Sequence, residues 1–113
     1  MSNKSRSPKY NTSSSQEKLY PDQLLVMYRQ RSRLTQKQVA DRLGLKSDRM
    51  LRVWEGGFGL PKAERLRQLI ELYLTLGVFT PGEVENEVAE LWQAVKARFD
   101  ATSERYETYP IFD

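Results

Sequence analysis

The sequence predicts an all-α fold of five helices with a long C-terminal helix and flexible tails. Two observations predict it. Apolar residues recur at helical spacing in five segments, and residues that start or stop helices, chiefly proline, threonine, serine and glycine, border these segments. With 113 residues, the chain has room for one compact domain plus tails. We expect this domain to span residues 21–99.

Residues 1–20 are rich in Ser, Asn and Lys, and they contain scarcely an apolar anchor before Leu19. Such a segment buries too little apolar surface to offset the entropy cost of ordering. We therefore expect a disordered basic tail. It either solubilises the chain or adds loose phosphate contacts through Lys4, Arg6 and Lys9.

The first two helices have clear start signals. Pro21 suits a first helical turn, and the apolar residues that follow at helical spacing predict a helix over about 21–32 (Leu24, Leu25, Tyr28). Thr35 and Gln38 form a capping-box pattern, which predicts a second helix over 35–43 that Gly44 ends. Its apolar face holds Val39, Ala40 and Leu43.

The third and fourth helices flank a glycine-rich stretch at residues 56–59. Ser47 can cap a helix over 47–55 with an apolar stripe of Met50, Val53 and Trp54. Pro61 then opens a longer helix over 61–76, which Gly77 ends. The core positions of this fourth helix are Leu66, Leu69, Ile70 and Tyr73.

A fifth helix is predicted over 81–99. Thr80, Pro81 and Glu83 combine a capping threonine, a proline at the first helical position and a glutamate at the third. The apolar stripe comprises Val84, Val88, Leu91, Trp92, Val95 and Phe99, and other faces carry Glu83, Glu85, Glu87 and Glu90.

Residues 100–113 form an aromatic tail or linker. Its apolar residues are too many for an ordinary solvated tail (Tyr106, Tyr109, Ile111, Phe112). Three interpretations stay open: the tail folds back on the helices, it is a docking peptide, or it begins a further domain.

The composition argues against most enzyme classes. The chain has no cysteine and no histidine, so thiol nucleophiles, Ser-His triads and the usual zinc ligands are absent. We expect no catalytic residues, no metal site and no cofactor. Because the sequence also lacks an apolar run long enough to cross a bilayer and an apolar N-terminal signal, we expect a cytoplasmic protein.

Charge is distributed unevenly along the chain. Residues 1–67 hold 15 Lys and Arg against 6 Asp and Glu, a net charge of +9, whereas residues 68–113 hold 3 against 9, a net charge of −6. A basic half suits a polyanion, because phosphate neutralisation releases condensed counterions. The alternative is a solvated charged surface without a partner.

A DNA-binding helix-turn-helix needs two short helices joined by a tight turn, here one with glycine. The second, basic helix enters the major groove while the first braces it. The run Leu34–Gly44 (LTQKQVADRLG) resembles the first half of the Cro and lambda-repressor-like (XRE-type) helix-turn-helix family, and Trp54-Glu55-Gly56 resembles its usual ending. The resemblance covers roughly Leu24 to Leu76.

That resemblance implies a lambda-repressor-like fold of five helices that recognises duplex DNA through its third helix. It also implies that Gln36, at the start of the second helix, touches the DNA backbone. In the same way, it implies that Ala40 and Gly44 let the two helices pack closely.

One departure from the family pattern affects the third helix. Gly44 and Trp54 are ten positions apart, one more than is common, and one extra residue rotates the positions downstream by about 100°. If the loop absorbs this residue, Met50 or Leu51 faces inward with Val53 and Trp54. Asp48 and Arg52 then face outward, with Arg49 on a flank. We prefer this register.

Arg49 and Arg52 are the leading base-contact candidates, because a guanidinium can bind guanine bidentately, and Asp48 can accept from a cytosine amino group. Phosphate contacts are expected from basic residues and from polar residues near helix starts: Arg31, Arg33, Thr35, Gln36, Lys37, Lys46, Ser47 and, as a further candidate, Arg42.

The sequence thus predicts a noncatalytic, sequence-specific binder of double-stranded DNA in transcription regulation, cytoplasmic and associated with the bacterial nucleoid. A homodimer or protein partner could use helix 81–99 and the tail from Tyr106 to Phe112. Residues 66–82 and the Trp92 helix are similar to N-terminal modules of bacterial signalling ATPases and WD-repeat proteins. The alternative is therefore a protein-interaction adaptor that keeps the fold; an RNA binder is a remote third.

Overall fold

The computed structural model describes residues 19–101, which form five α-helices and no strand. The helices are α1 (Pro21–Ser32), α2 (Gln36–Arg42), α3 (Arg49–Glu55), α4 (Ala63–Leu76) and α5 (Val84–Ala101). The predicted all-α fold of five helices is confirmed. Nearly all of the two expected tails, residues 1–18 and 102–113, lies outside the described residues.

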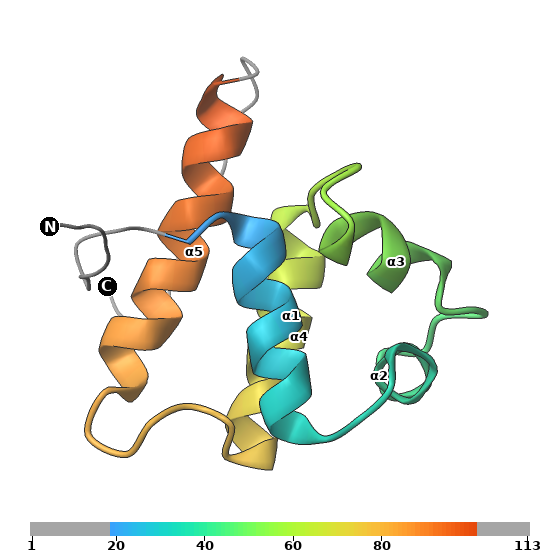
Figure 1. The fold of residues 1–113 in the computed structure, drawn as a ribbon, viewed down its shortest axis with the longest axis horizontal. Coiled ribbons are helices and arrows are strands. Elements are labelled where there is room, and N and C mark those ends of the chain that lie inside the picture. The colour runs from blue at the N-terminus through green and yellow to red at the C-terminus, as the bar shows by residue number, and fades with distance from the viewer. Residues whose placement is uncertain (1–18, 102–113) are drawn as a thin grey trace, which may run out of the picture.

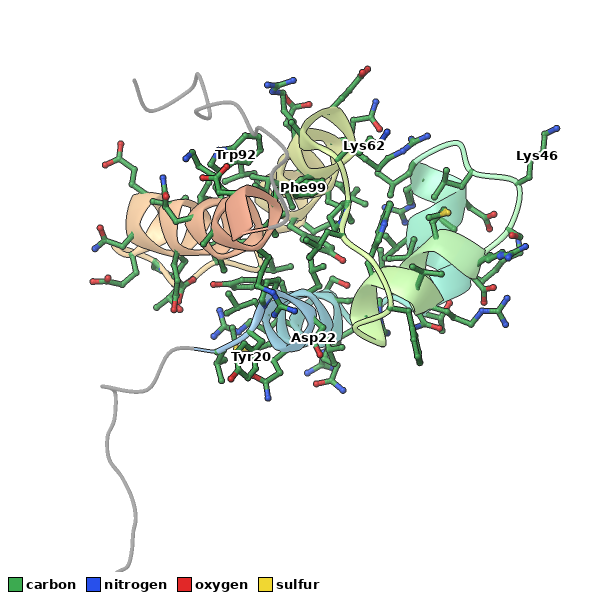
Figure 2. The ribbon with its side chains drawn as sticks, turned by 90° about the horizontal axis from the view of Figure 1, so that it is seen from above. Tyr20, Asp22, Lys46, Lys62, Trp92 and Phe99 are labelled. Carbon is green, nitrogen blue, oxygen red and sulfur yellow. The ribbon has the colours of Figure 1, made fainter. Side chains whose placement is uncertain are left out.

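The helices form three groups in space. Figures 1 and 2 show α1 and α4 in the middle, α5 on one side of them, and α2 and α3 on the other side. The loop between α2 and α3 lies at the edge farthest from α5. Within residues 19–101, no helix has the length and apolar character needed to cross a membrane.

One continuous core joins the helices. It contains most of the apolar residues that helical spacing placed on the inner faces, together with Leu51, Val78 and Phe79. The tyrosines Tyr28 and Tyr73 are fully buried, and neither hydroxyl has a hydrogen-bond partner within the described residues. Burial raises the pKa of both tyrosines well above the usual value.

The predicted capping of α2 is confirmed at both ends. The Thr35 hydroxyl accepts a hydrogen bond from the Gln38 backbone N–H, while the Gln38 side-chain oxygen accepts one from the Thr35 N–H. At the other end, Leu45 N–H donates to the Ala40 carbonyl and Gly44 N–H donates to the Asp41 carbonyl, which is a Schellman motif.

The role expected for Gly44 needs correction. A Cβ atom at this position would meet nothing within 4 Å, so Gly44 does not serve close helix packing. Its φ of 76° lies in the left-handed region, where residues with a side chain are strained. Gly44 is therefore needed for the turn itself, whereas the fully buried Ala40 does occupy a packed position.

Helices α3 and α4 begin later than expected. The N-cap of α3 is Asp48 rather than Ser47, although the Ser47 hydroxyl still accepts a hydrogen bond of 3.3 Å from the Arg49 N–H. Pro61 is buried in an extended segment before α4, whose N-cap is Lys62. Proline restricts the residue before it to extended backbone, which suits this connection as well as a helix start.

The start predicted for α5 is wrong, because the helix begins at Val84 and not at residue 81. Glu83 N–H donates to the Thr80 carbonyl at 2.8 Å, and Gly82 has a φ of 84°. These features, with Pro81 as the second residue, make a type II turn. Thr80 is not a helix cap: its N–H and hydroxyl both donate to the Glu87 carboxylate, at 2.8 and 2.9 Å.

Candidate nucleic-acid interface

The buried side of α3 fixes which residues face outward. Leu51 and Trp54 are buried in the core, Val53 is half-buried, and Arg49, Met50 and Arg52 are exposed. This is the register in which the loop absorbs the extra residue, and Leu51 rather than Met50 is the inward residue. The helix has only seven residues, so this exposed side is short.

The three base-contact candidates lie along α3: Asp48 is its N-cap, Arg49 is its first residue and Arg52 is in its last turn. The Arg52 Nη2 atom is 3.3 Å from the Asp48 Oδ1 atom, across one helical turn. Within residues 19–101, the Arg49 side chain has no hydrogen bond or ion pair. The short helix α3 therefore carries two exposed guanidinium groups. That of Arg52 forms an ion pair with Asp48, and that of Arg49 has no partner within residues 19–101.

The loop and α2 add further cations to this side of the molecule. Lys46 extends away from the loop between α2 and α3 (Figure 2). On α2, Arg42 is exposed in the last turn, and Lys37 forms an ion pair of 2.7 Å with Asp41. The hydrogen bond and charge of Asp41 raise the pKa of Lys37.

Gln36 contributes to a network inside the domain. Its Nε2 atom donates to a Glu55 carboxylate oxygen at 3.0 Å, and the Arg29 Nε atom donates to both oxygens of the same carboxylate, at 3.0 and 2.8 Å. The Arg29 Nη1 atom also donates to the Leu34 carbonyl. The Glu55 side chain is only 4% exposed, so one nearly buried carboxylate links α1, α2 and α3.

Sequence reasoning missed both Arg29 and Glu55 as residues that position this site. The available signal was the Trp54-Glu55-Gly56 ending, in which a glutamate follows a core tryptophan directly. An acidic residue at the inner edge of a short basic helix needs a cation, and Arg29 supplies it from α1.

Arg31 and Arg33 lie near the end of α1 but differ in their surroundings. The Arg31 guanidinium donates to the Val78 carbonyl at 3.2 Å, forms an ion pair of 3.3 Å with Glu87, and lies over the Tyr28 ring. It therefore joins α1 to α5. Arg33 is exposed, caps α1 with a φ of 64°, and comes two residues before the Thr35 cap of α2.

The two sides of the molecule differ in charge. The segment 36–52 carries five cations and two carboxylates, whereas α5 carries two cations and four carboxylates. Since α5 lies on the other side of α1 and α4 (Figure 1), cationic and acidic residues gather on opposite sides. The side containing α2 and α3 is the one suited to a polyanion.

Comparison with known proteins agrees with this geometry. A family model described as a helix-turn-helix domain matches residues 23–78, which run from the first turn of α1 to just past α4. No curated protein and no solved structure matches the chain. Through residues 23–78, which include the paired α2 and α3, the chain belongs to the helix-turn-helix domain family.

Proposed function

We propose that this protein binds double-stranded DNA in a sequence-specific manner and regulates transcription without catalysing a reaction. The helix-turn-helix domain itself suggests DNA binding. One observation carries the finer proposal: α3 buries Leu51 and Trp54 while its outer side presents Arg49 and Arg52. A helix held in this way can enter a major groove, with α5 turned away from the DNA.

Arg49 and Arg52 are proposed to read bases. A guanidinium that forms two hydrogen bonds to guanine O6 and N7 contributes roughly 1–3 kcal/mol of discrimination. Arg49 is exposed and has no side-chain partner within residues 19–101, so it loses no internal bond on binding. Arg52 retains N–H groups beyond the one near Asp48.

The phosphate contacts are proposed to come mainly from Lys46, Arg33, Arg42 and Lys37, which are exposed on or beside α2 and the loop. The hydroxyls of Thr35 and Ser47 lie near the starts of α2 and α3, respectively, and can add hydrogen bonds to phosphates. Arg31 and Gln36 remain candidates, but each would first have to leave a partner inside the domain.

A second candidate function, a protein-interaction adaptor, is favoured by a different surface. Phe58 is 86% exposed, and with Tyr20 and Trp54 it lines an open hollow of about 830 Å³. Exposed aromatic side chains of this kind are typical of interaction sites. In this alternative the domain is the N-terminal module of a larger bacterial signalling protein, and the partner surface lies beside the end of α3 rather than on its outer, arginine-bearing side.

The test is selection of bound sequences from a pool of random duplexes, followed by binding measurements on the selected site. We expect one preferred sequence, and an affinity that falls steeply between about 50 and 200 mM salt, because several phosphate contacts release counterions. Arg49→Ala and Arg52→Ala should each weaken preference at one base position. Arg98→Ala, which removes an exposed charge from α5, is the matched control and should leave preference unchanged.

No enrichment of any duplex at low salt would reject DNA binding and leave the adaptor. Enrichment without sequence preference would reject the specific mode alone. A regulator of this kind acts at the nucleoid in the cytoplasm, and colocalisation of a tagged chain with DNA would test that location.

A further inference from the structure

The start of α3 contains an acidic residue whose position is unusual for a DNA-facing helix. Asp48 precedes Arg49 directly, on the side of the molecule where cations outnumber carboxylates. A carboxylate close to DNA phosphates is repelled, so it needs a compensating role. The role expected for it from the sequence is to accept a hydrogen bond from a cytosine amino group.

Asp48 is not needed to cap the helix. It occupies the N-cap position, but its side chain accepts no capping hydrogen bond. The Ser47 hydroxyl accepts from the Arg49 N–H instead. The Asp48 carboxylate is therefore available for another partner, and the atom close to it is Arg52 Nη2, at 3.3 Å.

The two side chains differ in how far they reach into solvent. The Asp48 side chain is 30% exposed and that of Arg52 is 61% exposed, so the carboxylate lies nearer the body of the domain and the guanidinium lies outside it. An exposed ion pair of this spacing adds little to folding stability. It does restrict a long side chain that would otherwise sample many rotamers.

The contact also leaves the arginine able to bind a base. The printed approach to Asp48 is that of Nη2, and a guanidinium has five N–H donors, so Arg52 keeps further N–H groups for a base. Bidentate binding of guanine needs two parallel N–H groups in a suitable plane, and the ion pair with the nearby Asp48 carboxylate limits the orientations that this plane can take.

We propose that Asp48 is a positioning residue for specificity, which holds the Arg52 guanidinium in the orientation that reads guanine. This inference rests on the proposed function and extends it, because it gives Asp48 a role through Arg52 rather than a base of its own. It also explains why a carboxylate is present on a cationic face.

The test compares base preference, not affinity, because removing any carboxylate raises the affinity for all duplexes. Selection is performed with wild type, Arg52→Ala, Asp48→Ala, Asp48→Asn and the double variant of the two alanine substitutions. Asp41→Ala is the matched control, since Asp41 also forms an exposed ion pair one helical turn away, with Lys37 on α2. Thermal unfolding confirms that each variant is folded.

We expect Arg52→Ala to lower the preference for guanine at one position by about 5- to 150-fold. Asp48→Ala should lower preference at the same position by at least about threefold, Asp48→Asn by less, and Asp41→Ala not at all. In the Arg52→Ala background, the Asp48 substitution should have no further effect on preference. A fall that appears in both backgrounds would show that Asp48 acts independently of Arg52.

Other results overturn the inference in distinguishable ways. If Asp48→Ala changes a position that Arg52→Ala does not, Asp48 reads its own base. If Asp48→Ala raises affinity uniformly with preference intact, the ion pair does not orient Arg52. A wild-type chain that selects no sequence would reject the proposed function together with this extension.

Discussion

Replacing Glu55 by alanine removes the acceptor of three hydrogen bonds at once, two from Arg29 and one from Gln36. The Arg29 side chain is 17% exposed, so the substitution leaves a largely buried guanidinium without its counter-charge. Breaking a buried ion pair by removing one partner costs about 3–5 kcal/mol. Because Arg29 still donates to the Leu34 carbonyl, we expect the lower end of that range.

A loss of about 3 kcal/mol is large for a domain of this size, whose total stability is expected to be about 5–15 kcal/mol. For a domain of 60–100 residues, each kcal/mol shifts Tm by roughly 4–8 °C, so Tm should fall by about 12–24 °C. The measurement is urea unfolding and thermal unfolding at pH 7, monitored by circular dichroism and by fluorescence of the buried Trp54 and Trp92.

Two variants control this experiment. Glu55→Gln keeps an oxygen acceptor and removes the charge, so its loss should lie between those of wild type and Glu55→Ala. Glu85→Ala removes an exposed glutamate from α5 and should change stability by less than about 0.5 kcal/mol. A loss below about 1 kcal/mol for Glu55→Ala would refute the conclusion that this carboxylate holds α1, α2 and α3 together.

Three further outcomes are expected. Gly44→Ala should cost about 1 kcal/mol in urea unfolding because of its left-handed φ, and Gly44→Asn should cost less; equal losses would instead indicate a packing role. Tyr73→Phe should raise stability at pH 7 by about 1 kcal/mol, because the buried hydroxyl has no protein partner. Burial raises the pKa of Tyr73, so above the unfolded pKa of about 10 this tyrosine ionises in the unfolded chain before it does so in the folded one, and the free energy of unfolding of wild type falls. Tyr73→Phe should therefore lose less stability between about pH 9 and 11, and an unchanged pH profile would contradict this. Lys46→Ala should weaken binding to all duplexes alike and lower the salt slope by about one, whereas a change in base preference would show that Lys46 reads sequence.

The sequence predicted most of the fold because its strongest signals are local. The Thr35 and Gln38 capping box and the Gly44 turn act within a few residues, and the structure has both. The prediction of where α5 begins was wrong for an instructive reason. A Thr-Pro-Gly-Glu run fits a helix start and a type II turn equally well, and the positive φ of Gly82 selects the turn.

At the candidate site, the register of α3 could be predicted from the sequence, but the side-chain contacts of the basic residues could not. The burial of Trp54 follows from the apolar spacing of α3, so the outward position of Arg52 could be inferred. By contrast, Arg31 meets Glu87 across 56 positions of sequence, and Arg29 meets Glu55 across 26. Such pairs depend on how helices pack, which no local pattern specifies, and they decide which basic residues are free to contact a ligand.

The placement of α5 on the far side of α1 and α4 from α3 has a practical consequence (Figure 1). A fluorescent dye attached to the exposed side of α5, for instance through a cysteine in place of Gln93, would stand clear of the α3 surface. Since the chain contains no natural cysteine, such labelling would be confined to that single position. Fluorescence anisotropy with the labelled protein could then follow its tumbling as unlabelled duplexes are added.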